Sequence, residues 1–133
     1  MKLTRASSYA LHAVAFMAQQ KTDKPVASHN IAQARGIPER FLLKVLKPLV
    51  SAQILLSIKG PNGGYRLARG ANEITMLEVV EAVDGPIRGN APMGHDNPDS
   101  HLNKRLDQIC NTSAETLRKQ LGKVKLSELA GKD

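Results

Sequence analysis

The run of residues from Leu55 to Leu67 constrains the fold more than any other stretch of the chain. Its two halves alternate apolar with polar residues, which is the period of a strand with one buried face, and the apolar positions are Leu56, Ile58, Tyr65 and Leu67. Between the halves lies Gly-Pro-Asn-Gly-Gly, which cannot continue a strand because proline has no amide hydrogen for the ladder and glycine favours positive φ. The run therefore predicts a β-hairpin with a small, bare tip.

The positive charge of the chain is concentrated in the part that contains this hairpin. The first 70 residues carry eleven Lys and Arg against two acidic residues, whereas the rest of the chain carries eight against ten. Two of these cations, Lys59 and Arg66, flank the hairpin tip, which would fit beside a phosphate backbone. The asymmetry favours a polyanionic partner over a surface that is merely solvated. Aromatic residues make up 3% of the chain and Trp is absent, which excludes a single-strand binder that stacks bases on aromatic side chains.

The residues before the hairpin predict a first long helix and a second short one. Apolar residues from Ala6 to Ala18 recur every three or four positions, as on one face of a helix, and Thr4 is a suitable N-cap. Ser28 precedes a short helix from His29 to Arg35. Gly36 closes that helix, because glycine tolerates the left-handed conformation at a helix end.

A third helix is predicted from Pro38, whose missing amide hydrogen costs nothing in the first turn of a helix. Pro48 lies inside its apolar pattern, so the helix is expected either to kink there or to end near Lys47. The stripe expected to be buried comprises Phe41, Leu42, Val45, Leu46, Leu49 and Val50, and the opposite face comprises Arg40, Leu43, Lys44, Lys47 and Ser51.

These elements together predict a mainly α fold with a small β-hairpin wing, that is, a winged helix-turn-helix. The second and third helices flank a turn that contains Gly36, the third has a basic outer face, and the hairpin follows directly. The alternative is a small helical domain whose hairpin has no binding role. That alternative does not explain why cations gather on both the third helix and the hairpin.

Two more helices are predicted after the hairpin. Thr75 and Glu78 form a capping box for a fourth helix, which ends at the Asp-Gly-Pro of residues 84–86. A long amphipathic helix follows at about Leu102 to Val124, and too little of the chain remains to bury its apolar face, unless it folds back as part of the core. Its apolar seam comprises Leu102, Leu106, Ile109, Leu117, Leu121 and Val124, and Leu126 and Leu129 would follow in a short segment that docks onto the body.

The motifs together resemble the IscR/BadM-type (Rrf-two) family of winged-helix transcriptional regulators. The resemblance spans nearly the whole chain and is carried by the N-terminal Met-Lys-Leu-Thr with Tyr9-Ala10, the turn at Gly36-Ile37, the wing from Lys59 to Arg69 and the Glu-Ala-Val-Asp-Gly-Pro of residues 81–86. It implies a bacterial, dimeric regulator in which the long helix packs against its twin across a two-fold axis. The regions expected are a winged helix-turn-helix DNA-binding domain at 1–86, a flexible loop at 87–101, and a dimerisation helix with a C-terminal segment at 102–133.

The chain departs from this family in the loop between the fourth helix and the long helix. Members that bind an iron–sulphur cluster carry three cysteines there, whereas this chain has a single cysteine, Cys110, outside the loop. A cluster ligated as in those relatives is therefore excluded, and no cofactor is expected. The loop offers Met93, His95, Asp96, Asp99 and His101, of which His95, Asp99 and His101 are weak candidates for a zinc or iron site, because a polar loop collects such residues by chance.

Cys110 falls on the predicted long helix beside Ile109. One interpretation is a small buried hydrophobe at or beside the seam. The other is a redox switch in which the thiols of two protomers crosslink, which requires a reactive thiol and two Cα atoms that lie close together across the dimer axis. The sequence leaves both interpretations open.

We expect a cytoplasmic homodimer that binds double-stranded DNA at a pseudo-palindromic operator and represses transcription by occupying a promoter. The third helix would enter the major groove, where Glu39 would accept a hydrogen bond from a cytosine amine and Leu43 would touch a thymine methyl group. The wing would lie in the minor groove and read its width through Lys59. The contact residues expected are Pro38, Glu39, Arg40, Leu43 and Lys44 at the third helix, Arg5, Ser7, Ser8, Tyr9 and Lys47 at phosphates, and Lys59, Gly60, Pro61, Asn62, Gly63 and Gly64 in the wing.

A winged helix can also bind protein, so the alternative function is an interaction module that docks an enzyme or another regulator. The charge asymmetry argues against it, because protein docking does not require so basic a half. An enzyme is not expected, since the sequence shows no nucleophile elbow and no phosphate-binding loop followed by a helix. No apolar run approaches the length of a membrane span. A signal, where there is one, would act through an unidentified small molecule or protein partner.

Overall fold

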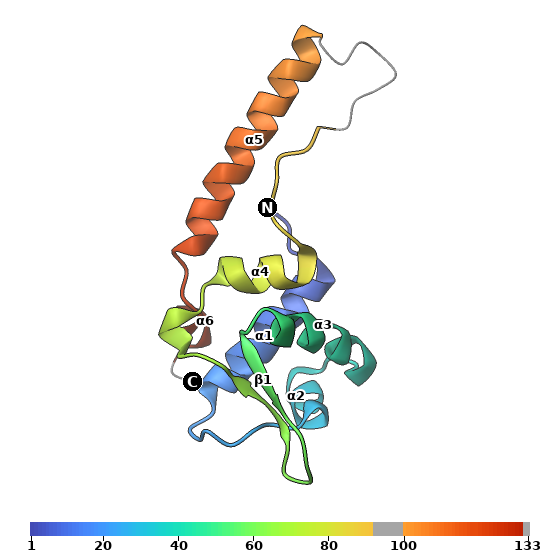
Figure 1. Ribbon diagram of the computed structural model, residues 1–133, viewed down its shortest axis with the longest axis vertical. Helices are drawn as coiled ribbons and strands as arrows, with labels where there is room; N and C mark the ends of the chain where they lie inside the picture. The colour runs from blue at the N-terminus through green and yellow to red at the C-terminus, as the bar shows by residue number, and fades with distance from the viewer. Residues whose placement is uncertain (92–99, 132–133) are drawn as a thin grey trace.

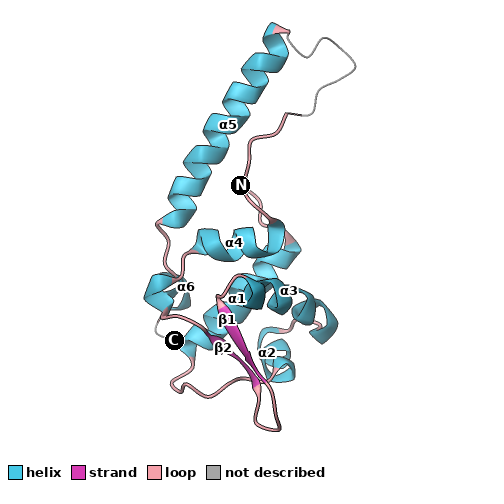
Figure 2. Cartoon of the chain, in the orientation of Figure 1, coloured by secondary structure: helices cyan, strands magenta, loops and turns pink. Residues whose placement is uncertain are grey.

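The computed structural model describes residues 1–91 and 100–131, in which one two-stranded sheet extends from a body of packed helices (Figures 1 and 2). The winged helix-turn-helix predicted from the sequence is confirmed, with α2 and α3 as its helix pair and β1–β2 as its wing. No helix in these two ranges has both the length and the apolar composition needed to cross a membrane. In chain order the elements are α1 (Arg5–Gln19), α2 (Ser28–Arg35), α3 (Glu39–Ser51), β1 (Leu55–Ile58), β2 (Gly64–Leu67), the 3-10 helix η1 (Ala71–Glu73), α4 (Met76–Asp84), α5 (His101–Gly122) and α6 (Leu126–Ala130).

Helix α1 is the centre of the hydrophobic core. Its buried face is made of small and medium residues, Ala10, Ala13, Val14 and Met17, so that α2, α3, α4 and α6 can all pack closely against it. Leu126 of α6 is fully buried in this core, which confirms that the C-terminal segment docks onto the body. The prediction was wrong for Leu129, which is 43% exposed.

Local sequence signals set the ends of the first two helices. The Thr4 side chain accepts a hydrogen bond from the Ser7 N–H at 3.0 Å, so Thr4 caps α1 as predicted. Gly36 adopts a left-handed conformation with φ of 64° and ends α2, also as predicted. Ser28 is the first residue of α2 rather than a residue preceding it, and Ala27 takes the N-cap position without a side-chain bond.

Helix α3 runs without interruption through Pro48 to Ser51, so of the two alternatives predicted at Pro48 the end near Lys47 does not occur. The helix continues because buried leucines precede and follow the proline, and the Pro48 carbonyl still accepts a hydrogen bond from Ala52 at 2.9 Å. The buried stripe is narrower than predicted: Phe41 is 37% exposed and Val50 is half-buried. The residues of α3 that are buried are Leu42, Val45, Leu46 and Leu49.

In the first strand of the wing hairpin, the buried and exposed faces are the reverse of those predicted. Leu55 pairs with Leu67 and is fully buried, whereas Leu56 and Ile58 are 40% and 37% exposed. The predicted alternation of buried and exposed residues in β1 was shifted by one residue. Such a shift exchanges the two faces of a strand. The second strand agrees with the prediction, because Tyr65 and Leu67 both pack against the core.

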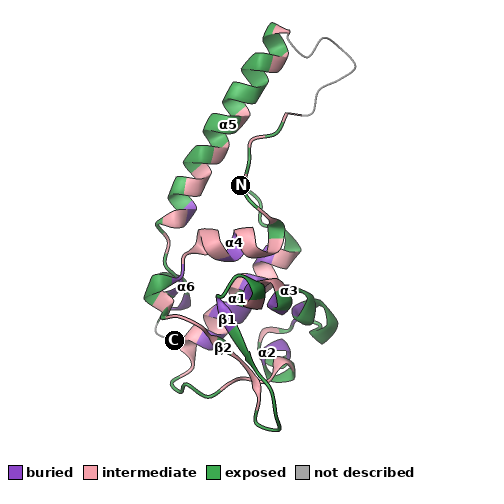
Figure 3. Cartoon of the chain, viewed as in Figure 1, coloured by how far each residue is buried: buried purple, intermediate pink, exposed green. Residues whose placement is uncertain are grey.

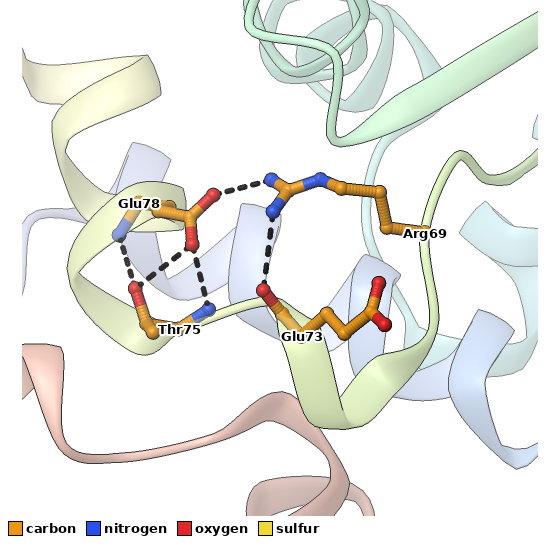
Figure 4. A network of polar contacts seen from close by, with 4 residues as sticks. All are labelled: Arg69, Glu73, Thr75 and Glu78. Carbon is orange, nitrogen blue, oxygen red and sulfur yellow. Dashed lines mark hydrogen bonds and ion pairs between the residues drawn. The ribbon is translucent and has the colours of Figure 1, made fainter.

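A polar network joins the end of the wing to α4 (Figure 4). The Thr75 hydroxyl accepts from the Glu78 N–H at 3.1 Å and the Glu78 carboxylate accepts from the Thr75 N–H at 3.3 Å, which confirms the predicted capping box. Arg69 pairs with Glu78 and also donates to the Glu73 carbonyl at 3.1 Å. Burial alone would raise the pKa of Glu78, but the hydrogen bond and charge of Arg69, together with Thr75, hold it below its ordinary value. The ionised carboxylate therefore anchors the exit of the wing to α4.

Helix α5 projects from the body at one end of the molecule, and the hairpin tip lies at the other end (Figure 1). It is exposed along most of its length and becomes buried only near its C-terminal end (Figure 3). There Leu121 is 7% exposed, and the carbonyl of Val124, beyond the helix, accepts a hydrogen bond from the Met76 N–H at 2.8 Å. Placing Leu121 on an open seam was therefore wrong, because α4 of the same chain packs against this end of α5, whereas Val124 is half-buried.

Candidate nucleic-acid interface

The outer face of α3 carries a cluster of two cations around an aromatic ring. The guanidinium of Arg40 lies 4.8 Å and the ammonium of Lys44 lies 5.6 Å from the centre of the Phe41 ring. Such cation–π contacts hold flexible cationic side chains over a ring face. Leu43 is 43% exposed and Lys47 is exposed on the same helix. The face thus combines fixed positive charge with exposed apolar surface, the two chemistries needed for phosphate and base-edge contact.

Sequence analysis missed Phe41 as a member of this face. Spacing could not separate it from the buried stripe, because residue 41 lies four positions before the buried Val45. The available signal was charge, since cations stand one residue before and three residues after Phe41, as on an outer face.

Glu39 stands in the first turn of α3, and its carboxylate accepts a hydrogen bond from the Ser28 hydroxyl at 2.8 Å. A carboxylate at a helix N-terminus is favoured by the helix dipole. The bond ties the start of α3 to the start of α2 and fixes the direction of the carboxylate. A carboxylate has about four acceptor sites, so Glu39 keeps acceptor capacity for a base amine. Pro38 precedes it as the exposed N-cap residue.

The tip of the wing is closed by a hydrogen bond from the Gly63 N–H to the Gly60 carbonyl at 3.0 Å. Lys59, Gly60, Pro61 and Asn62 are exposed around this turn, as predicted for a bare tip. Gly63 and Gly64 are half-buried, because the base of the tip lies against other backbone. Both glycines therefore shape the base of the tip.

The start of α1 supplies fewer contact residues than predicted. Arg5 is exposed, and Ser8 and Tyr9 are half-buried, Tyr9 against the core. Ser7 is fully buried, and its hydroxyl donates to the Asp84 carboxylate at 2.5 Å. Thr4 donates to the same carboxylate at 2.9 Å. Assigning Ser7 to a phosphate was wrong, since its side chain instead joins α1 to the end of α4.

Ser7→Ala is expected to lower the free energy of unfolding by about 1–3 kcal/mol, because a hydrogen bond to a charged group is lost from a buried site. Ser8→Ala is the matched control, since the Ser8 side chain makes no hydrogen bond with the described residues, and its effect should stay within about 0.5 kcal/mol. Urea unfolding of both variants measures the difference. Equal midpoints for the two variants would contradict the anchoring role of Ser7.

Of the candidate metal and redox residues, the structure describes only His101 and Cys110. Met93, His95, Asp96 and Asp99 lie outside the described residues, and His101 is the exposed first residue of α5. Among residues 1–91 and 100–131, no three His, Cys, Asp or Glu side chains gather as a metal site would require. Cys110 is half-buried on α5 and has no disulfide within this part of the chain.

A protein-family model matches nearly the whole chain. The model of the Rrf2 family, described as iron-dependent transcriptional regulators, matches residues 3–132. The chain belongs to the Rrf2 family. The resemblance to IscR/BadM-type (Rrf-two) regulators that the motifs carry is thereby confirmed.

Relatives and solved structures agree with this membership of the Rrf2 family. The HTH-type transcriptional regulator Rv1287 of Mycobacterium tuberculosis is 30% identical over 132 residues, which cover 98% of this chain and 82% of the relative. IscR of Photobacterium profundum is 37% identical over 84 residues, 63% of this chain and 49% of the relative. The structure of CymR (YrzC), named the global cysteine regulator of B. subtilis, superposes with a TM-score of 0.78 at 25% identity, covering 98% of this chain and 96% of CymR. This Rrf2 protein is thus a DNA-binding transcriptional regulator and not an enzyme.

Proposed function

We propose that this Rrf2 protein is a cytoplasmic, homodimeric repressor that binds a pseudo-palindromic operator and occupies a promoter. The observation that carries the proposal is the cluster of Arg40 and Lys44 around the exposed Phe41 ring on the outer face of α3. In a winged helix-turn-helix this face enters the major groove. Arg40, Leu43 and Lys44 would then meet base edges, Arg5, Tyr9 and Lys47 would meet phosphates, and the tip at Lys59 would enter the minor groove.

The proposed dimer rests on the apolar stripe of α5. Leu102, Leu106 and Ile109 are 65%, 39% and 45% exposed, although such residues are usually buried. The chain's own contact with the opposite face is made near Gly89, where an added Cβ would lie 2.5 Å from the Asn111 nitrogen. The stripe is therefore free for a second copy, which would place two wings and two α3 helices on one duplex.

We further propose that the protein acts without an iron–sulphur cluster of the three-cysteine type, although its family is described as iron-dependent. The chain has one cysteine, and such clusters need several thiolates. The half-buried Cys110 lies at the edge of the proposed dimer stripe, so a thiol crosslink between protomers remains the redox alternative.

Operator affinity is expected to fall steeply with salt, with a log–log slope of about −5 if the dimer neutralises about six phosphates. The physical reason is the release of counterions when cations such as Arg40 and Lys59 replace them at the backbone. A fluorescence anisotropy titration at several salt concentrations measures the slope. The buffer contains an iron chelator. Tight operator binding in this buffer would therefore also support the proposal that the protein acts without a cluster.

The alternative function is docking to another protein through the wing. It is favoured by Leu56 and Ile58, which leave an apolar strip exposed on the outer face of β1. Hydrophobic docking would give an affinity nearly independent of salt, and an operator affinity that stays flat in the same titration would reject the repressor proposal in its favour.

A further inference from the structure

A cavity of about 390 Å³ lies between the turn that follows α1, residues 20–26, and the segment from β2 to η1. Pockets that bind small molecules commonly measure about 300–1,000 Å³ and combine apolar walls with a few polar groups. This cavity lies at the base of the wing, and the contacts proposed for α3, for the wing tip at Lys59 and for the seam of α5 involve none of its lining residues. The buried and half-buried residues that line it include Met17, Val26 and Leu67, and the exposed ones at its rim include Asp23, Lys24 and Arg66.

One wall of the cavity is an unpaired strand edge. Tyr65 exchanges two backbone hydrogen bonds of 2.8 Å with Val26, so this edge of β2 faces the turn. Every second residue of an antiparallel strand presents its N–H and C=O to the same edge, so the next pair belongs to Leu67. No described residue pairs with β2 at that point. The Lys24 N–H, which would be the partner in a continued ladder, donates instead to the Thr22 hydroxyl at 3.2 Å.

Charges of both signs stand beside this edge. Arg66 donates to the Asp23 carbonyl at 3.5 Å, so its side chain spans the mouth of the cavity from the strand to the turn. A guanidinium has five N–H donors, which leaves most of those of Arg66 for a ligand. The Asp23 carboxylate and the Lys24 ammonium are exposed on the turn. The Arg66 guanidinium and the Leu67 N–H thus lie at the same cavity as the Asp23 carboxylate and the Leu67 C=O.

We propose that this cavity binds a free α-amino acid with an apolar side chain. Its carboxylate would pair with Arg66 and the Leu67 N–H, its ammonium with Asp23 and the Leu67 C=O, and its side chain would lie against Met17 and Val26. An α-amino acid carries an ammonium and a carboxylate on one carbon beside a side chain, which matches this arrangement. The ligand would occupy the place of the missing strand residue and hold the wing to the turn after α1. Binding is independent of the proposed operator function, and only its effect on the wing rests on that function.

The test is a titration of the isotope-labelled full chain with L-leucine in the absence of DNA. The chemical shifts of the backbone amides are measured by NMR at each leucine concentration. Saturable shifts are expected at Leu67 and Arg66. The probes 4-methylpentanoate, which lacks the ammonium, and 3-methylbutylamine, which lacks the carboxylate, should bind about tenfold or more weakly, because each loses one charged pair. Arg66→Gln should weaken leucine binding at least about fivefold. Lys59→Gln removes an exposed cation of the same hairpin outside the cavity and should leave leucine binding unchanged.

The absence of saturable shifts at Leu67, equal binding of either single-charge probe, or unaltered binding by Arg66→Gln would each overturn the proposal. Operator affinity with and without L-leucine is measured separately. An unchanged operator affinity would reject the effect on the wing. A wild-type protein that binds leucine but no operator would reject the proposed function while supporting the amino-acid site.

Discussion

Replacing both Leu106 and Ile109 by aspartate is expected to convert the protein to a monomer and to lower its operator affinity about a hundredfold or more. The two side chains are 39% and 45% exposed on the free face of α5, where a second copy would cover them. Two aspartates at the centre of that contact would have to be desolvated without partners. Each monomer would then bind one half-site without the effective concentration that the second half-site supplies. Sedimentation velocity and operator titration of the same samples measure both effects.

Lys104 and Gln108 provide the matched control on the same helix. Both are exposed and lie on the face away from the Leu106–Ile109 stripe. Changing both to aspartate introduces the same side chains and removes more positive charge than the test variant does. If the control remains a dimer with operator affinity within a few fold of wild type, charge alone is not the cause. A wild-type protein that sediments as a monomer at micromolar concentration would refute the proposed dimer.

The sequence predicted those features whose cause is local. The caps at Thr4 and at Thr75–Glu78 and the left-handed Gly36 each depend on a few neighbouring residues, and the structure confirms all three. The hairpin is local in the same sense, because Gly-Pro-Asn-Gly-Gly cannot continue a strand. Family motifs then indicated how these elements combine, which periodicity alone would not have done.

The sequence predictions were wrong for residues whose burial or hydrogen bonding depends on a distant part of the chain. Ser7 was assigned to a phosphate together with Arg5, Ser8 and Tyr9, but the Asp84 carboxylate, far along the chain, accepts a hydrogen bond from its hydroxyl in the interior. Leu56 and Ile58 alternate as a buried face would, yet Leu55 is the fully buried residue of β1, directly after the buried Ile54, so the two faces of the strand are exchanged. Sequence periodicity shows that a helix or strand has an apolar face, and tertiary packing decides which residues that face contains.

Gly64→Ala is expected to lower the free energy of unfolding by about 3 kcal/mol and to reduce operator affinity, because the wing can no longer pack against the turn before α2. Gly64 has φ of 149°, a conformation that other residues rarely adopt. A Cβ at this position would lie 2.4 Å from the Val26 oxygen and 2.8 Å from the Ala27 nitrogen. Both are backbone atoms, so the clash is relieved only by breaking the bridge between Val26 and Tyr65.

Gly60→Ala is the control that separates the cost of the steric clash at Gly64 from the cost of placing alanine at a positive φ. Gly60 also has a positive φ, 110°, but a Cβ there meets no atom within 4 Å. This variant carries only the conformational strain of about 1–2 kcal/mol. The further loss of stability in Gly64→Ala, measured by urea unfolding, therefore reports the contact between the wing and Val26. If the two variants unfold at the same urea concentration, that contact does not hold the wing in place. The amino-acid cavity next to the Val26–Tyr65 bridge would then lack a rigid wall.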